Sequence, residues 1–177
     1  MSKTNSISAR IILAAGVLVL CALALGCQQK MADATVLGQA AKSVMLNSVE
    51  IYNTGNTNLV EAVISPNYIG HVSSLSEPVI GRQGYIDWVQ VNRTAFSDFS
   101  VVATNLIAEN NLVALQWTVT GVNDGMMRDM QPTGKRVNVK GLTLARVEDG
   151  KIVEEWITWD LLDMYRQLGV EPPATTM

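Results

Sequence analysis

Cysteine and histidine are almost absent from this 177-residue chain. It contains two cysteines, Cys21 and Cys27, and one histidine, His71. Both cysteines belong to the N-terminal segment, so the rest of the chain has no thiol for a disulfide, a nucleophile or a cysteine-based zinc site. One histidine is also too few for a metal centre. The sequence therefore predicts no metal site and no thiol-dependent chemistry.

Long hydrophobic runs are missing as well, with one exception near the N-terminus. Residues 11–25 form an uninterrupted run of 15 residues of the types Ile, Leu, Val, Ala, Gly and Cys, preceded by a polar start with Lys3 and Arg10. A helix needs about 20 residues to span a bilayer, so this run is typical of an export signal. Ala24-Leu25-Gly26-Cys27 resembles a bacterial lipobox, in which the cysteine is lipidated. Ordinary signal cleavage and an uncleaved anchor are the alternatives.

These features divide the chain into four segments. We expect a lipoprotein signal peptide with its acylation site Cys27 (residues 1–27), a polar tether (28–35), one folded domain (36–170) and a tail (171–177). Gln28 follows the cysteine, where an aspartate would retain a lipoprotein in the inner membrane, so the pattern is similar to that of outer-membrane lipoproteins. We therefore expect the cell envelope, with the lipid in the outer membrane and the domain facing the periplasm.

Basic residues are scarce in the expected domain. Without the signal peptide the chain keeps 11 lysines and arginines against 16 acidic residues, a net charge of −5. No basic cluster stands out in the sequence. A mildly acidic domain of this kind is a poor candidate for binding nucleic acid.

The pattern of apolar residues predicts helices first and strands afterwards. Spacings of three and four indicate a helix that closes at residues 53–55, a short helix from Asn58, and a third helix over residues 85–96. Alternation indicates strands over residues 99–122, joined near Asn110-Asn111, and over 135–147 and 151–159. A last helix should follow Asp160 and end at Gly169. This order favours an α+β domain with helices packed on one face of a curved sheet.

One carboxylate falls on an otherwise apolar face of the last predicted hairpin. A three-residue loop, Glu148-Asp149-Gly150, pairs Val147 with Lys151 and places the odd-numbered residues of both strands on one face, including Glu155. Burying an unpaired carboxylate is unfavourable, and a raised pKa or a partner relieves it, as in many active sites. The alternatives are a glutamate at a wet strand end or one paired with a cation. A two-residue loop would instead expose Glu155.

Several short motifs resemble those of the SnoaL-like family, the polyketide cyclase and ester cyclase group of the nuclear transport factor 2 superfamily. The resemblance covers residues 49–169 and rests on the segments 52–56 (YNTGN), 66–71 (PNYIGH), 95–99 (AFSDF), 131–137 (QPTGKRV) and 149–169. It implies a cone-shaped, curved antiparallel sheet packed by N-terminal helices, with a deep apolar pocket and no cofactor. Members of the family cyclise polyketide esters, isomerise or hydroxylate ring systems, or have no known activity.

The same resemblance implies that the cyclase acid/base residues are replaced here. The aspartate of the cyclases falls on Ile157 and an accompanying histidine on Thr143, so neither ionisable group is present. Glu155 should share a face with Ile157 and is the leading catalytic candidate, because apolar neighbours would raise its pKa toward neutrality. His71, in a segment that the resemblance places at the pocket, is the second candidate, and a surface histidine is the alternative.

The remaining candidates are weaker. Asp160 matches a recurring aspartate of the family, but with Asp163 it also suits the N-cap of the last helix, which is the favoured interpretation. Candidates for contacting a ligand are residues with an apolar body or a place on the inner face, although many such residues only fill a core. They are Tyr52, Tyr68, Trp88, Trp117, Thr143, Ile157 and Trp159.

Three functions remain open at this point, and whether the protein is an enzyme is uncertain. The first is a cofactor-independent cyclase or isomerase that acts on a small lipophilic carbonyl compound. The second is a lipoprotein that binds a lipophilic molecule without chemistry. The third is an interaction module, because Leu142, Leu144 and Trp156 on the outer sheet face could pair with a second copy in a homodimer.

Overall fold

The computed structural model describes residue 28, residues 33–127 and residues 130–172. The predicted signal peptide and Cys27 lie outside the described residues, as do residues 29–32 of the tether and 173–177 of the tail. Residues 33–35, which were assigned to the tether, are helical. Within the described part of the chain, no helix is long and apolar enough to cross a bilayer.

The described chain folds into helices and one sheet, as the sequence pattern predicted. It runs through a helix over residues 33–54, the short 3-10 helix η1 (Thr57–Leu59), α2 (Val60–Val63), β1 (Ile64–Val72), β2 (Val79–Ile80), α3 (Gly81–Ala95), β3 (Ser97–Glu109), β4 (Leu112–Val122), β5 (Arg136–Glu148), β6 (Lys151–Trp159) and α4 (Leu161–Leu168). The N-terminal helix ends before Gly55, whose φ of 70° is the left-handed conformation that glycine adopts without strain.

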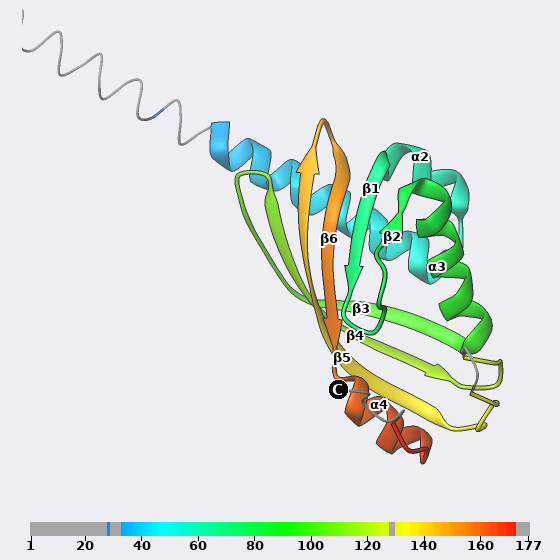
Figure 1. The fold of residues 1–177 in the computed structure, drawn as a ribbon. Helices are drawn as coiled ribbons and strands as arrows, with labels where there is room; N and C mark the ends of the chain where they lie inside the picture. Colours follow the sequence, from blue (N-terminus) through cyan, green and yellow to red (C-terminus); the bar gives the residue numbers. More distant parts are fainter. Residues whose placement is uncertain (1–27, 29–32, 128–129, 173–177) are drawn as a thin grey trace, which may run out of the picture.

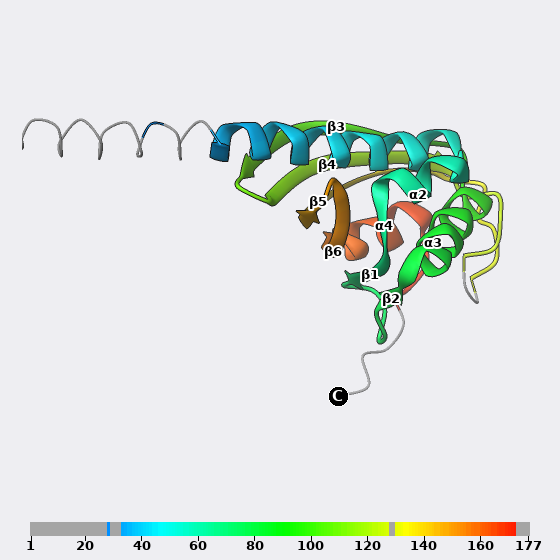
Figure 2. The same ribbon diagram turned by 90° about the horizontal axis from the view of Figure 1, so that it is seen from above.

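The six strands form one curved sheet in the order β2-β1-β6-β5-β4-β3. Neighbouring strands are antiparallel except for β1 and β6, which run parallel. The N-terminal helix, α3 and α4 lie on the concave side of the sheet (Figures 1 and 2). The predicted α+β class and the curved sheet packed by helices are confirmed.

The β5–β6 hairpin differs from its prediction in a way that matters for Glu155. Its loop has two residues, Asp149 and Gly150, whose φ values of 49° and 72° suit a type I′ turn, and Glu148 pairs with Lys151. The predicted three-residue loop is therefore wrong. The strand pairing then shifts within the hairpin, because Val147 pairs with Ile152 and Arg146 with Glu154, which leaves Val153 as an extra residue.

The extra residue Val153 forms a β-bulge. The bulge cancels the change of sheet face that the shorter loop would otherwise cause for Glu155. Before the bulge, Ile152 takes the inner position that had been predicted for Val153, and it is fully buried. After the bulge, Ala145 pairs with Glu155 and Thr143 with Ile157, so the inner face again carries the odd-numbered residues of β6. The burial predicted for Glu155 is confirmed, although the predicted loop did not produce it.

The hydrophobic core fills the concave side in two clusters. The larger cluster joins the N-terminal helix and α3 to the middle of the sheet, through residues such as Met45, Tyr85 and Leu115. The smaller one packs Met164 and Leu168 of α4 against Val137 and Val139 of β5. Because both clusters use the same face of the sheet, the helices enclose space between themselves and the strands.

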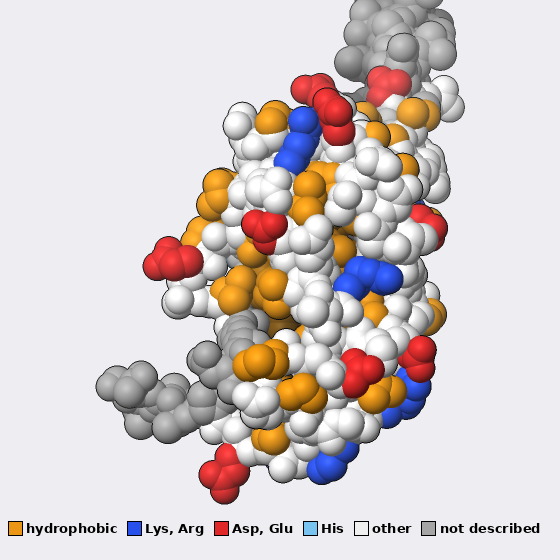
Figure 3. All heavy atoms as spheres, turned by 90° about the vertical axis from the view of Figure 1, so that its right-hand side faces the viewer, with side chains coloured by type: hydrophobic (Ala, Val, Ile, Leu, Met, Phe, Trp, Pro, Cys, Tyr) orange, Lys and Arg blue, Asp and Glu red, His pale blue; other side chains and the backbone are white. Residues whose placement is uncertain are grey.

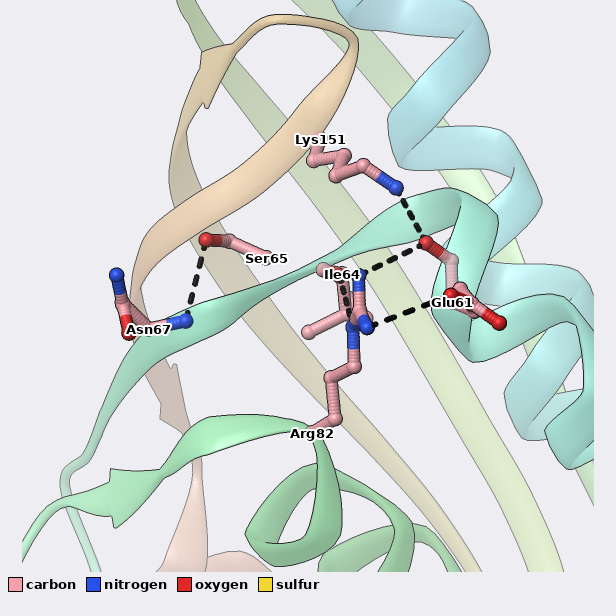
Figure 4. A network of polar contacts seen from close by, with 6 residues as sticks. All are labelled: Glu61, Ile64, Ser65, Asn67, Arg82 and Lys151. Atoms are coloured by element: carbon pink, nitrogen blue, oxygen red, sulfur yellow. Dashed lines mark hydrogen bonds and ion pairs between the residues drawn. The ribbon is translucent and has the colours of Figure 1, made fainter.

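Polar contacts fix the start of β1 beside β6 (Figure 4). Arg82 of α3 donates from Nε to the carbonyl oxygen of Ile64 at 2.9 Å and from Nη2 to that of Glu61 at 3.3 Å. Lys151, the first residue of β6, also donates to the Glu61 carbonyl. These donors satisfy carbonyl groups at the end of α2 and set the position from which β1 runs along β6.

Glycine at position 141 makes room for an indole ring on the inner face. Gly141 of β5 pairs with both Trp117 of β4 and Trp159 of β6. A Cβ at this position would overlap the Trp117 ring. The ring is held there by a hydrogen bond of 3.0 Å from its Nε1 to Oγ1 of Thr143.

We predict that Gly141→Ala lowers the free energy of unfolding by about 1–3 kcal/mol, because the added methyl forces the Trp117 ring out of its place. Gly38→Ala is the matched control, since a Cβ at Gly38 meets Ala108 at an ordinary 3.7 Å within a helix. The control should be neutral or slightly stabilising. Urea unfolding of both variants checks this, and equal stability of the two would contradict the packing described here.

Candidate functional site

A cavity of about 530 Å³ lies between the concave face of the sheet and the helices. Its walls are mainly apolar and come from the N-terminal helix, α3, β3 to β6 and α4. In the space-filling view, hydrophobic side chains gather around a hollow in the surface (Figure 3). This volume lies within the range of pockets that bind small molecules.

Glu155 is a buried ionisable residue on the sheet wall of this cavity. Its side chain comes from the middle of β6 and is 3% exposed. The hydroxyl of Tyr68 donates to its Oε2 at 2.7 Å. Burial raises the pKa of Glu155 from 4.5 to about 7, against the opposing effect of the Tyr68 hydrogen bond. The carboxyl group can therefore both take up and release a proton near neutral pH.

Three tyrosines surround the carboxyl group. The rings of Tyr52 and Tyr85 meet edge to face at 5.8 Å between centroids, and those of Tyr68 and Tyr85 at 5.4 Å. Burial raises the pKa of each tyrosine well above its usual value, and the charge of Glu155 raises it further. All three hydroxyls therefore keep their protons when Glu155 is ionised, and the proton that moves at neutral pH is that of Glu155.

The structure brings most of the predicted ligand contacts to the cavity. Its lining includes Tyr52, Trp88, Trp117, Thr143, Ile157 and Trp159. The rings of Trp88 and Trp159 are stacked with centroids 5.9 Å apart, and Trp117 lies against Trp159 at 6.5 Å. Tyr68 does not line the cavity but stands behind Glu155. The indole rings of Trp117 and Trp159 therefore share the sheet wall of the cavity with Glu155, and Trp88 contributes to the wall from α3.

His71 lies on the opposite face of the sheet from the cavity. In β1, Gly70 is aligned with Glu155 and His71 with Trp156, so the two neighbours point to opposite sides. His71 is 42% exposed, with its Nε2 3.0 Å from Oε1 of Glu154 and its ring stacked on Trp156 at 5.5 Å. The expectation that His71 belongs to the pocket is wrong, and its alternative, a surface histidine, describes its place.

Asp160 is also outside the cavity lining. It is exposed, and its carboxylate accepts a hydrogen bond of 2.9 Å from the backbone N–H of Asp163 in the first turn of α4. This is the N-cap arrangement that the sequence favoured. Capping accounts for the aspartate at this position.

Sequence reasoning missed many residues of the cavity wall. The strand residues among them include Leu115, Val119 and Val139, which share the inner face of the sheet with Trp117 and Thr143. The alternation of inner and outer residues along each strand could therefore have identified them. The helix residues had no such signal, because the angle at which each helix crosses the sheet decides which of its side chains reach the cavity. They include Met45, Ser48, Val49, Asn92 and Met164.

The charges of the cavity wall have one sign. Glu155 and Glu171 are its only ionisable carboxylates, and no lysine, arginine or histidine is among the described residues that line it. No group of three or more His, Cys, Asp or Glu side chains that could hold a metal ion occurs in the described ranges. The described part of the wall is suited to a ligand without negative charge, since none of its described side chains would balance an anion.

Comparisons with known proteins agree with this fold. The model of the SnoaL-like polyketide cyclase family matches residues 42–168, and the chain belongs to this family. It is 32% identical over 129 residues to the aklanonic acid methyl ester cyclase DnrD of Streptomyces peucetius, an alignment that covers 72% of this chain and 88% of that protein. The corresponding cyclase AcmA of Streptomyces galilaeus is 29% identical over 131 residues, covering 72% and 89%.

Solved structures share the architecture. A structure from Jannaschia sp. CCS1, described as a putative SnoaL-like polyketide cyclase, superposes with a TM-score of 0.70 at 23% identity, covering 77% of this chain and 96% of the other. Wild-type IdmH from Streptomyces antibioticus, described as a putative polyketide cyclase, gives a TM-score of 0.65 at 25% identity, with 73% and 99% covered. The predicted membership of the SnoaL-like family is confirmed.

We predict that the buried carboxyl makes the protein less stable as the pH rises. In the unfolded chain Glu155 loses its proton near pH 4.5, whereas the folded protein holds it to about pH 7. Between these values the folded state binds more protons, so the stability present at pH 4 falls by an amount on the order of 3 kcal/mol by pH 8. In the variant Glu155→Gln this fall in the free energy of unfolding should be absent, because glutamine does not titrate in this pH range.

Urea unfolding of the natural protein and of Glu155→Gln at pH 4, 6 and 8 measures the effect. Other titrating groups are common to both proteins, so they cancel in the difference. A difference in free energy of unfolding that stays constant over this pH range would contradict the burial of an ionisable Glu155.

Proposed function

We propose that this protein is a cofactor-independent cyclase or isomerase that moves a proton next to a carbonyl group of a small, uncharged lipophilic compound. The observation that carries the proposal is the burial of Glu155 in an apolar cavity with its pKa near 7. A carboxyl group with such a pKa is an efficient general base and general acid at neutral pH.

The proposed reaction needs only the proton of Glu155. The carboxylate takes a proton from the carbon next to a carbonyl group, which leaves an enolate and a neutral carboxylic acid. The enolate carbon then attacks a second carbonyl of the same molecule, and the resulting alkoxide takes the proton back from Glu155. Atoms and charge balance, the product is an isomer of the substrate, and the carboxylate is restored.

The cyclases of the family support this chemistry, but their acid/base residue occupies a different position from that of Glu155. In the cyclases that the chain resembles, the acid/base aspartate falls at Ile157 and a histidine at Thr143. These two residues are cross-strand partners at the cavity wall here, and Glu155 precedes Ile157 by two positions on the same face. A glutamate side chain is one methylene longer than aspartate, which helps Glu155 to reach a ligand in the same cavity.

The cavity wall also supports an uncharged substrate. Its indole rings and methionines offer apolar contact, and none of the described residues that line it is a cation that would bind a carboxylate or phosphate group. The relatives from Streptomyces are named for a methyl ester, in which the acid is masked. Aklanonic acid methyl ester is therefore the first compound to test.

We predict that Glu155→Gln abolishes turnover of aklanonic acid methyl ester by the full-length protein, because glutamine has no proton to exchange at neutral pH. Glu154→Gln is the matched control, since Glu154 is the next residue of β6 and lies on the outer face with His71. In D₂O, reversal of the first step places deuterium on the carbon next to the carbonyl of the recovered substrate, and mass spectrometry detects this label. Chromatography detects the cyclised isomer. Equal turnover by both variants would remove Glu155 from the mechanism.

A second candidate is a protein that binds a lipophilic molecule without chemistry. The observation that favours it is the replacement of the two cyclase groups by Ile157 and Thr143. Native mass spectrometry of the purified protein would then find a retained small molecule, and binding would survive Glu155→Gln. Binding of aklanonic acid methyl ester without deuterium exchange in the natural protein would favour this candidate over the enzyme.

We also propose that the domain is anchored to the bacterial envelope by a lipid on Cys27 and forms a homodimer. The support for the anchor is the resemblance of residues 24–27 to a lipobox. The support for the dimer is the outer sheet face, where Val102 is 55% exposed and Leu142 is 46% exposed. We predict that sedimentation at micromolar concentration finds a dimer that Leu142→Lys dissociates, and a monomeric natural protein would contradict it.

A further inference from the structure

We propose that Tyr68 is the positioning residue of Glu155 and that Gly70 is required beside it to leave room for the Tyr68 hydroxyl. The three residues form one unit across the parallel β1–β6 pair. The inference rests on the proposed function in one respect only, which is that the positioned carboxylate is the base. The geometry itself does not depend on any reaction.

The hydrogen bond joins two buried side chains from distant parts of the sequence. Tyr68 is 1% exposed and Glu155 is 3% exposed, and the bond from the hydroxyl to Oε2 measures 2.7 Å. A hydrogen bond from a neutral donor to a buried carboxylate is short and strong. It takes up Oε2 and fixes the plane of the carboxylate, so Oε1 is the oxygen left for a ligand.

Gly70 supplies the space that this bond needs. It is aligned with Glu155 in the parallel pair, two residues after Tyr68 and on the same face of β1. A Cβ on Gly70 would overlap the Tyr68 hydroxyl and would come within 2.9 Å of the ring carbon that carries it. Gly70 is not among the glycines with positive φ, so the reason for glycine here is the room that it leaves.

Tyr68 can only donate a hydrogen bond to the carboxyl group of Glu155, and it cannot accept a proton from it. The pKa of Tyr68 is raised well above 10 by burial and by the charge of Glu155, so its hydroxyl keeps its proton and remains a donor. Donation stabilises the carboxylate over the carboxylic acid, whereas burial favours the acid. These opposing effects keep Glu155 ready both to accept and to return a proton near neutral pH.

The test is a titration of Glu155 in the full-length protein. Carbon-13 NMR follows the side-chain carboxyl carbon, which is assigned by its absence from Glu155→Gln. Tyr68→Phe removes the hydroxyl with little change of shape, and we expect the midpoint to rise by about one to two pH units, since a hydrogen bond to a charged group contributes about 1.5–3 kcal/mol. Gly70→Ala keeps the hydroxyl but displaces it, so its midpoint should rise in the same direction.

Two controls separate positioning from loss of structure. Tyr85→Phe removes another buried tyrosine hydroxyl, from a ring that packs on Tyr68, and it should move the midpoint far less because Tyr85 is not the donor to Glu155. In Tyr68→Phe/Gly70→Ala, the second change should add almost nothing to the midpoint, because the hydrogen bond is already lost. Circular dichroism confirms that each variant folds.

An unchanged midpoint in Tyr68→Phe would overturn the proposal, and so would additive shifts in the double variant. Neither result depends on finding a substrate. If the proposed reaction is also observed, the lower limb of the pH profile of kcat/KM should move upward with the NMR midpoint in Tyr68→Phe. If no reaction is found but the midpoints shift as expected, the positioning unit stands and the catalytic proposal fails.

Discussion

The structure depends on the accommodation of one carboxyl group, that of Glu155, on the apolar concave face of the sheet. An ionised carboxylate in such a place is strongly unfavourable unless it has a partner. No cation reaches it from the described residues that line the cavity, and its hydrogen-bond partner is the neutral hydroxyl of Tyr68. The protein therefore holds Glu155 in the range where its charged and neutral forms are both accessible.

Several features of the fold serve this arrangement. The bulge at Val153 keeps Glu155 on the inner face despite a two-residue turn, and Gly70 leaves room for the hydroxyl that holds it. The contacts of Arg82 and Lys151 with carbonyls at the start of β1 set that strand beside β6. Together these features bring residues 87 positions apart into contact.

Features that depend on a few neighbouring residues, such as turns and helix ends, could be predicted from the sequence. Gly55, Asn110-Asn111, Asp149-Gly150 and the cap at Asp160 mark turns and helix ends, and the alternation of β5 marks its inner face. The position of His71 could not be predicted in this way. In β1 the inner residues Tyr68, Gly70 and Val72 include a glycine, so the alternation does not reveal which face is buried, and the pairing with β6 is set by contacts distant in sequence. Asp149-Gly150 marked the turn of the last hairpin, but the length of its loop was predicted wrongly. The bulge at Val153 could not be predicted, because it leaves no clear mark in the sequence.

Membership of the SnoaL-like family explains the architecture, and the residues of this chain narrow its chemistry. Ile157 and Thr143 stand where the resemblance places the ionisable pair of the cyclases, and Glu155 lies two residues before Ile157 on the same strand face. The described wall of the cavity is mainly apolar, with an aromatic region formed by Trp88, Trp117 and Trp159. It carries two carboxyl groups, of which that of Glu155 is buried and that of Glu171 is exposed. Such a wall suits a reaction that needs one shuttled proton and an uncharged substrate.

The central claim is that Glu155 exchanges its proton near neutral pH inside the cavity. The most direct measurement is infrared difference spectroscopy of the natural protein minus Glu155→Gln, in which the carbonyl stretch of a protonated carboxyl group is followed with pH. We expect this band to be present at pH 5 and to disappear with a midpoint near pH 7. A band that has already disappeared by pH 5 would contradict it, because Glu155 would then titrate like a glutamate in water.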